Sequence, residues 1–237
     1  MEIIKFTEVE STQDLAFSFA ENNCNPFTFI LADYQTKGRG QIGRFWHGEI
    51  GNSLLFSVVI YPSSHSNASL IPIRTGIALT SVLQKYCSEE IKLKWPNDLF
   101  VNHGKLCGIL CEAKTHKNSI HLALGVGLNL MKFDFKTQIN NQINPAFLQD
   151  YSNEIIDKNS IFTEVANELV IKLSNNSEIL SSKEIEEFNS INYLYQKVIS
   201  KDYLGKKLQG IGIGINEFGH FKVVQNDGEI ICLISNL

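Results

Sequence analysis

Apolar positions recur along the chain with two different periods, which predict a mixture of helices and strands. Helical spacing runs from Leu70 to Tyr86 and again from Phe162 to Leu173. A further helix is expected near the N-terminus, where Ser11 or Thr12 offers a capping hydroxyl before an apolar stretch. Short runs rich in β-branched and aromatic residues predict strands at 27–32, 53–61, 91–95, 99–101, 106–112 and 120–130.

The pattern changes near Tyr193, beyond which glycines separate short β-prone runs. Asn226-Asp227-Gly228, placed between two apolar pairs, is typical of a β-hairpin. We therefore expect two domains, an α+β domain over residues 1–190 with a mixed sheet flanked by helices, and a small β-barrel over residues 193–237. The polar segment from Lys136 to Asn144 predicts a solvated loop.

Composition limits the classes of protein that fit. Hydrophobic residues make up 43% of the 237 and charged residues 19%, so a packed core is expected and wholesale disorder is excluded. The net charge of -4 argues against coating nucleic acid or anionic lipid. Five cysteines without a CxxC pair favour reduced, buried thiols. The N-terminus lacks a signal peptide and no apolar run approaches the ~20 residues that span a bilayer, so we expect a soluble, cytoplasmic protein.

One long segment, from Gln35 to Gly51, is rich in glycine and has no apolar period. It holds Arg39 and Arg44, although only three of the chain's 21 basic residues are arginines. Forked guanidinium groups bind carboxylates and phosphates, and the glycines let the backbone approach a ligand. The segment therefore predicts a loop that folds over an anion. Chance clustering of surface charge or an RNA contact would give the same pattern.

Two further elements carry candidate chemistry. Lys105 begins a predicted strand after the turn 96–98, and Gly108 lies further along the same strand. The run Gly125-Val126-Gly127 removes side chains from one face of another strand, which leaves space for a flat ligand. An ordinary exposed lysine and close helix packing are the alternatives for these two elements.

Taken together, four motifs in order resemble the biotin protein ligases. They are Gln35 with GRGQIGRFW (38–46), KWPND (94–98), GKLCGILCE (104–112) and GVGLN (125–129). The resemblance is strong from about Ile3 to Asn129 and weaker beyond. It implies a catalytic fold like that of class II aminoacyl-tRNA synthetases, followed by a small SH3-like β-barrel. It also implies that biotin is activated with ATP to biotinyl-5'-AMP and then transferred to a lysine of a biotin carboxyl carrier protein domain.

The resemblance further assigns residues. It implies catalytic roles for Lys105, Arg39 and Arg44. The implied biotin contacts are Ser11, Thr12, Gln13, Gln35, Gly38, Arg39, Gly40, Gln41, Lys105, Gly108 and Gly125. The implied ATP and adenylate contacts are Arg39, Arg44, Trp46, Lys94, Asn97, Asp98, Lys105 and Asn129. The aromatic side chain over adenine is left open among Phe133, Phe135 and Phe147. No metal motif is present, and Mg²⁺ is expected to arrive with ATP.

Two departures from the family pattern bear on function. The catalytic motifs begin close to residue 1, so we expect no helix-turn-helix and no DNA binding. Gln41 stands where the family usually has arginine, so the adenylate is expected to be held less firmly. The carboxylase that is modified and the choice between monomer and homodimer stay open, and no membrane partner is expected. A lipoate or octanoate ligase and an RNA-binding module are the competing functions.

Overall fold

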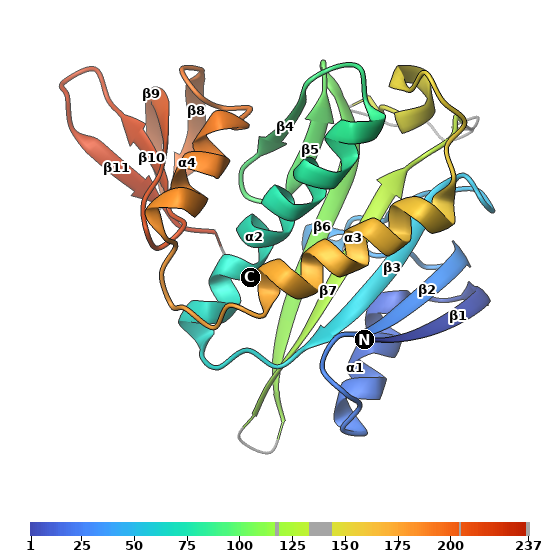
Figure 1. Cartoon of the computed structure of the whole chain (residues 1–237). Coiled ribbons are helices and arrows are strands. Elements are labelled where there is room, and N and C mark those ends of the chain that lie inside the picture. The colour runs from blue at the N-terminus through green and yellow to red at the C-terminus, as the bar shows by residue number, and fades with distance from the viewer. Residues whose placement is uncertain (117–118, 133–143, 204, 236–237) are drawn as a thin grey trace.

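The centre of the molecule is a seven-stranded mixed sheet with strand order β1-β2-β3-β7-β6-β5-β4 (Figure 1). The computed structural model describes residues 1–116, 119–132, 144–203 and 205–235. β1 is parallel to β2, and the other neighbouring pairs are antiparallel. The strands are β1 (Glu2–Val9), β2 (Thr28–Gln35), β3 (Ser53–Ile60), β4 (Ile91–Lys94), β5 (Asp98–Val101), β6 (Gly104–His116) and β7 (Ser119–Asn129).

Helices cover both faces of this sheet. α2 (His65–Leu83) and α3 (Lys158–Leu173) pack on one face, and α1 (Thr12–Glu21) packs on the other (Figure 1). Side chains alternate between the faces of a strand, so one strand can contribute to two cores. On β2, Phe29 contacts Phe162 of α3, whereas Ile30 belongs to the smaller apolar cluster under α1. The predicted mixed sheet flanked by helices is therefore confirmed.

The expected elements are present with shifted bounds. The helix expected at 70–86 begins earlier, at His65, because the hydroxyl of Ser64 caps it by accepting from the Asn67 N–H. Ser11 occupies the N-cap position of α1, but its hydroxyl makes no capping bond, which corrects the expected cap. Two elements were not predicted, β1 and α4 (Ser182–Ser190). Most of the predicted loop 136–144 lies outside the described residues.

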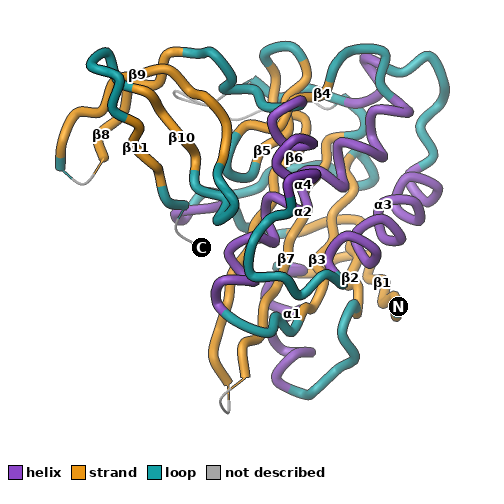
Figure 2. The backbone as a smooth tube through the Cα atoms, turned by 60° about the vertical axis from the view of Figure 1, so that its left-hand side comes forward, coloured by secondary structure: helices purple, strands orange, loops and turns teal. Residues whose placement is uncertain are grey.

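The C-terminal strands form a separate antiparallel sheet in the order β11-β10-β9-β8 (Figure 2). Its strands are β8 (Val198–Tyr203), β9 (Lys206–Ile215), β10 (Phe221–Val224) and β11 (Ile230–Leu233). The hairpin predicted at Asn226-Asp227-Gly228 joins β10 to β11. The expected closed barrel is wrong, because β8 and β11 share no ladder in the described part of the chain. The Tyr203 hydroxyl instead accepts from the Ile234 N–H at 3.2 Å, so a side chain links the two edges.

The two sheets share one continuous apolar core. The indole of Trp95 packs on Phe221 and donates from Nε1 to the Gly219 carbonyl at 3.0 Å. Along β4, the Leu93 N–H donates to Ile191 O and the Leu93 carbonyl accepts from the Tyr193 N–H. The C-terminal sheet is thus joined to the central sheet by buried contacts, and the segment that leads into it is held to β4 by main-chain hydrogen bonds. The division into domains at 190–193 stays a prediction.

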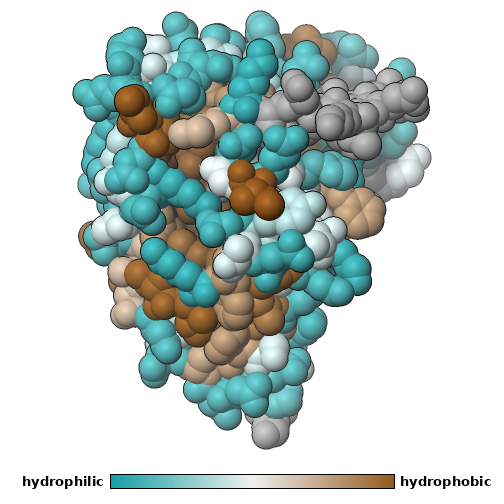
Figure 3. Space-filling model, turned by 90° about the vertical axis from the view of Figure 1, so that its right-hand side faces the viewer, coloured by the Kyte–Doolittle hydropathy of each residue, from teal (hydrophilic) through white to brown (hydrophobic). Residues whose placement is uncertain are grey.

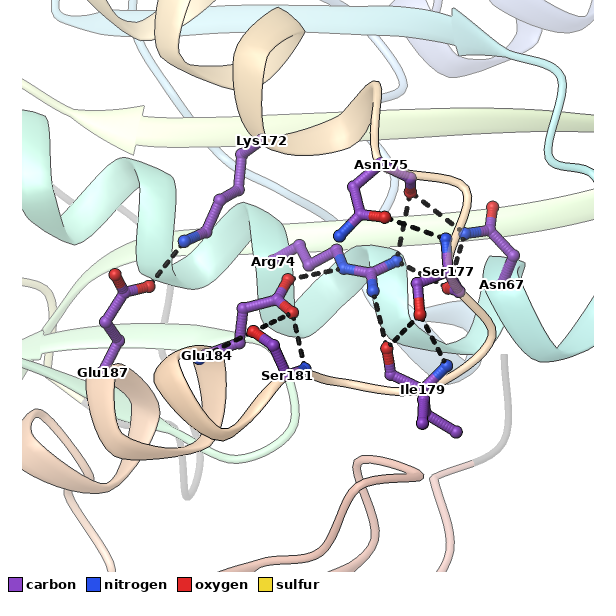
Figure 4. Close-up of polar contacts among 9 residues, drawn as sticks. All are labelled: Asn67, Arg74, Lys172, Asn175, Ser177, Ile179, Ser181, Glu184 and Glu187. Atoms are coloured by element: carbon purple, nitrogen blue, oxygen red, sulfur yellow. Dashed lines mark hydrogen bonds and ion pairs between the residues drawn. The ribbon is translucent and has the colours of Figure 1, made fainter.

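The third arginine of the chain, Arg74, is a buried residue of α2 (Figure 4). The Nε of Arg74 donates to Glu184 at 2.8 Å, and its other nitrogens donate to the carbonyls of Asn175, Ser177 and Ile179. Burial raises the pKa of Glu184, but hydrogen bonds from Ser181 and Arg74 outweigh it, so that the pKa lies below its usual value. This network ties α4 and the segment before it to α2.

The free edge of the central sheet is β1, which lies on the side of the molecule that faces the viewer in Figure 3. Apolar and polar surface are interleaved on this face. Ile3 is exposed on β1, as are the charged side chains of Glu2, Lys5 and Glu8. Charges on an edge strand discourage pairing with another chain. Separately, a search of the described residues finds no helix that is both long enough and apolar enough to cross a membrane.

Candidate active site

A cavity of about 450 Å³ lies between the central sheet and the segment 38–46, hereafter the glycine–arginine loop. Cavities of this size hold small-molecule ligands in proteins. Its lining combines backbone and side chains from α1, the glycine–arginine loop and strands β2, β3, β5, β6 and β7. The sequence-predicted residues found in the lining are Ser11, Thr12, Gln13, Gln35, Arg39, Gly40, Gln41, Arg44, Trp46, Asn97, Asp98, Lys105, Gly108, Gly125 and Asn129.

One corner of the cavity is polar and is built around the start of α1. The Thr12 N–H and hydroxyl donate to Gln35 Oε1 at 2.7 and 3.0 Å, and the Thr12 hydroxyl lies 2.8 Å from that of Ser57. Ser57 in turn donates to Gln13 Oε1 at 3.1 Å. The Ser11 hydroxyl is buried without a partner among the described residues. This corner can therefore bind a small ligand that has both donors and acceptors on one edge.

The glycine–arginine loop is a small hairpin. Arg39 and Phe45 form an antiparallel bridge, the Gly40 N–H donates to Arg44 O at 2.8 Å, and the Trp46 N–H donates to Gly38 O at 2.9 Å. A Cβ at Gly38 would come within 2.5 Å of the Trp46 carbonyl oxygen, which explains why glycine is needed there. The hydrogen bonds of the loop give it a defined shape over the cavity.

The two arginines of this loop lie in different environments. The guanidinium of Arg39 is 2.5 Å from Asp14 Oδ1 and 2.5 Å from Glu112 Oε1. The side chain of Arg44 lines the cavity and forms no ion pair with any residue that the structure describes. Arg44 is therefore the loop cation available to an anionic ligand, whereas two carboxylates already neutralise Arg39.

The glycines of β6 and β7 accommodate side chains of the protein itself. A Cβ at Gly127 would lie 2.4 Å from Trp46 Cε2, and one at Gly125 would lie 2.6 Å from Gln13 Oε1. A Cβ at Gly108 would meet Trp46 Cζ3 at 2.8 Å. The missing side chains at Gly108 and Gly127 thus let the Trp46 indole pack against the sheet and form part of the cavity wall.

Lys105 projects into the cavity from the start of β6. Its Nζ lies 2.7 Å from Asp98 Oδ1 and 5.5 Å from the centre of a Trp46 ring. The backbone of Lys105 pairs with residues 144–146, and its carbonyl also accepts from the Asn129 side-chain amide at 3.2 Å. These contacts place an ammonium group, a carboxylate and an amide together at one end of the cavity.

Two predicted site residues do not line the cavity formed by the described residues. Lys94 lies with its Nζ over the ring of Phe100 at 5.1 Å, and Gly38 is at the base of the glycine–arginine loop. Of the aromatic candidates for adenine, Phe147 is buried and absent from the lining. Phe133 and Phe135 lie outside the described residues.

Several lining residues were not predicted from the sequence. They are Phe45, His47, Phe56, Ser57, Ile109, Leu110, Val126 and Pro145, whereas Gly127 belongs to the glycine pair expected to leave space for a ligand. A signal was available for Ser57, which is the polar residue inside the otherwise apolar run 54–60. Asp14 and Glu112, which bind Arg39, were also missed, because nothing local in the sequence pairs them with it.

The cysteines do not supply an activated thiol at this site. The cysteines are free, and burial raises the pKa of Cys107 and of Cys111, so both are protonated thiols at neutral pH. No cysteine is part of the cavity lining formed by the described residues. The same residues contain no cluster of three His, Cys, Asp or Glu that could hold a metal ion.

Comparison with known proteins decides the family. The model of the biotin/lipoate A/B protein ligase family matches residues 4–129, which is more than half of the chain. The chain belongs to this family. Within it, the bifunctional ligase/repressor BirA of Bacillus spizizenii is 27% identical over 66% of the chain and 49% of its own length. The biotin--[acetyl-CoA-carboxylase] ligase of Paracoccus denitrificans is 34% identical over 43% of the chain and 44% of its own length.

A solved member of the family matches nearly the whole chain. The biotin protein ligase from Aquifex aeolicus, in complex with biotin and ATP, superimposes with a TM-score of 0.82 at 25% identity. The match covers 99% of this chain and 96% of that protein. By contrast, the chain spans about half the length of the curated ligase/repressor relatives that it matches.

Proposed function

We propose that the chain is a biotin protein ligase that activates biotin with ATP and transfers it to a lysine of a carrier protein. The observation that carries this proposal is the convergence of three groups on one cavity: the polar corner at α1, the Arg44 guanidinium and the Lys105 ammonium. Biotin has a polar ureido ring at one end and a carboxylate at the other. The polar corner suits the first end and the cations suit the second.

In the first proposed step, a carboxylate oxygen of biotin attacks the α-phosphorus of ATP and pyrophosphate leaves. Two anions must approach each other, so catalysis requires positive charge at the point where they meet. Lys105 is assigned to bridge the carboxylate and the α-phosphate, and Arg44 is assigned to the phosphates. The amide of Asn129, at the same end of the cavity, is assigned to adenine.

In the second proposed step, a carrier lysine amine attacks the acyl carbonyl of biotinyl-5'-AMP. The C–N bond forms, the bond from the acyl carbon to the phosphate oxygen breaks, and AMP and a proton are released. The hairpin shape of the glycine–arginine loop would shield the mixed anhydride from water before this attack. The carrier is assigned to the biotin carboxyl carrier domain of a carboxylase, in line with the name of the Paracoccus relative.

Mg²⁺ would support the first step by neutralising phosphate charge. Asp98 is the carboxylate residue that lines the cavity within the described part of the chain, and its Oδ1 is paired with Lys105. Mg²⁺ is commonly held by one or two carboxylates together with substrate phosphates and water. The donor set therefore fits an ion that arrives on ATP, with Asp98 as its protein contact.

Two measurements test the proposed function. Calorimetric titration with biotin should show binding that tightens sharply when ATP is also present, because the adenylate forms. Label from biotin, but not from lipoate, should then appear on a biotin carboxyl carrier domain and be absent from a domain whose acceptor lysine is arginine. Transfer of lipoate instead would assign the chain to the other branch of the family. Absence of pyrophosphate release with either acid would refute the proposal.

A further inference from the structure

Three rings lie together near the far end of the β6–β7 hairpin. His121 on β7 packs edge-on against Tyr61, with the ring centres 5.2 Å apart, and its ring centre is 5.5 Å from that of His116 on β6. His121 is only 5% exposed, and its Nδ1 is buried without a hydrogen-bond partner among the described residues. The Tyr61 hydroxyl donates to the Cys24 carbonyl at 2.9 Å. A proton added at Nδ1 of His121 would therefore have no acceptor in the described part of the chain.

The charges around His121 also disfavour its protonated form. Burial lowers the pKa of His121, and the neighbouring His116 imidazole lowers it further, whereas the Glu21 carboxylate opposes both effects. The remaining titratable groups that the structure describes around these rings are the ammonium of Lys114, which pairs with His121 across the ladder, the phenol of Tyr61 and the thiol of Cys24. The protein thus holds His121 as a neutral imidazole at neutral pH.

These rings lie beside the attachment of α1 to the sheet. α1 packs on a small apolar cluster that is separate from the main core, and Tyr61 packs against the same cluster. The Lys114 ammonium, on the strand next to His121, lies 4.0 Å from the ring centre of Phe17 in α1. Elements with few buried apolar contacts open locally more easily than the rest of a fold. A charge on His121 would therefore act next to a weakly attached helix.

The same helix carries the polar corner of the cavity at its other end. In its first turn, Gln13 donates from Nε2 to the Ala123 carbonyl at 2.9 Å and accepts from the Ser57 hydroxyl. Ala123 lies two residues beyond His121, so the two side chains are on the same face of β7. A change in the packing of α1 on this face would therefore also move Thr12 and Gln13.

We propose that protonation of His121 loosens α1 from the sheet and thereby weakens ligand binding at the polar corner. An exposed histidine has a pKa of 6.5, and the pKa of His121 in the folded protein is lower. Opening of α1 therefore takes up a proton and becomes easier as the pH falls below 6.5, until the folded pKa is passed. The coupling is reciprocal, so a ligand that holds α1 on the sheet must make His121 harder to protonate.

The first arm of the test needs no ligand. Protection factors for hydrogen exchange of the α1 amides should fall between about pH 7.5 and about pH 5.5 in the wild type. They should fall much less in His121→Phe, which keeps a ring beside Tyr61 but cannot titrate. The matched control is His103→Gln, because His103 is exposed in the turn between β5 and β6, and this variant should respond like the wild type. An equal fall in His121→Phe and the wild type would overturn the proposal.

A second variant decides the first arm if His121→Phe does not fold. His116→Gln removes the neighbouring imidazole that opposes protonation of His121. The pKa of His121 should then lie closer to 6.5, and the fall in protection of α1 on acidification should be smaller. A fall as large as that of the wild type would contradict the proposal.

The second arm rests on the proposed function and uses biotin as the probe. A carboxylate with a pKa near that of glutamate, about 4.3, stays ionised over this pH range. Calorimetry should show biotin affinity weaker by about 5-fold or more at the lower pH in the wild type, the low end of couplings between sites. The change should be markedly smaller in His121→Phe, which retains His47 in the cavity lining.

The same arm has a direct readout of His121. Its pKa, measured by NMR, should fall when biotin is added, because coupling acts in both directions. An affinity that is equally pH-dependent in the wild type and His121→Phe, or a pKa that biotin leaves unchanged, would refute the coupling to the polar corner. If the wild type binds no biotin at either pH, the proposed function fails, whereas the exchange experiment still decides whether protonation opens α1.

Discussion

The indole of Trp46 lies on β7 where a Cβ at Gly127 would be 2.4 Å from its Cε2 atom. The glycine–arginine loop can therefore pack on β7 only because residue 127 has no side chain, since any side chain there would displace the indole. The Lys105 ammonium lies over the Trp46 ring. Displacing the indole would therefore disturb both the cavity wall and the position of this ammonium group.

Gly127→Ala should weaken biotin binding and destabilise the fold. Forcing an extra methyl into a close-packed position costs about 1–3 kcal/mol. The free energy of unfolding from urea titration and the biotin affinity from calorimetry would measure the two effects. In a Trp46→Ala background the same substitution should cost little, because the clashing indole is gone. An equal cost in both backgrounds would contradict the packing argument.

Lys105→Ala should lower the rate of adenylate formation by a larger factor than it lowers the affinity for biotin. If the ammonium stabilises charge that develops between carboxylate and phosphate, its loss should slow adenylate formation by about 10²–10³-fold. Biotin-dependent exchange of pyrophosphate into ATP measures this step. Lys92→Ala, which removes from β4 an ammonium paired with Glu90, provides the control and should leave the rate unchanged. A normal exchange rate in Lys105→Ala would remove Lys105 from the proposed mechanism.

Gln41→Arg should slow release of the adenylate. Gln41 lines the cavity and is neutral, so it contributes no charge to hold a phosphate. A guanidinium in its place adds a charge-assisted contact, which is worth about 1.5–3 kcal/mol when fully formed. A stopped-flow chase of pre-formed biotinyl-5'-AMP measures the dissociation rate constant. An unchanged rate would show that residue 41 does not reach the phosphate.

Glu184→Gln should destabilise the protein at neutral pH by roughly 3 kcal/mol, the lower end of the cost of breaking a buried ion pair. The pKa of Glu184 lies below its usual value in the folded protein, so its ionisation stabilises the fold above the unfolded pKa. That contribution is lost as the pH falls through the folded pKa. The stability difference between wild type and variant, measured by urea titration, should therefore shrink below about pH 4.5. A constant difference across this range would contradict the assignment.

The sequence was most informative where the site is made of contiguous residues. The segment 38–46 and Gly125 could be found because glycines and arginines cluster there within short windows, and Lys105 because it begins a predicted strand. The partners of these residues come from distant elements. Asp14 and Glu112 meet at Arg39 only when α1 packs on the sheet that contains β6, and no spacing in the chain encodes that arrangement.

Where the structure departs from the sequence analysis, the physical origin is similar. Lys94 and Asn97 belong to one short motif, but Lys94 ends β4 whereas Asn97 lies in the turn before β5, and the cavity lining in the described residues includes Asn97 and not Lys94. The C-terminal hairpin was predictable from its turn residues, whereas closure of the barrel depends on whether the first and last strands pair. In this chain a tyrosine hydroxyl spans that gap.

β4 is an edge strand of the central sheet, and residues 191–193 form main-chain hydrogen bonds with it. These bonds cover part of that edge. Truncating the chain after α4 would remove these bonds and leave the Trp95 indole without its acceptor at Gly219. In the remaining fragment, β4 would be an unpaired edge strand and the Trp95 indole would be exposed to solvent. Unpaired edge strands and exposed apolar surface both favour aggregation. The segment 191–193 and the C-terminal sheet thus cover a strand edge and an aromatic surface that would otherwise favour aggregation.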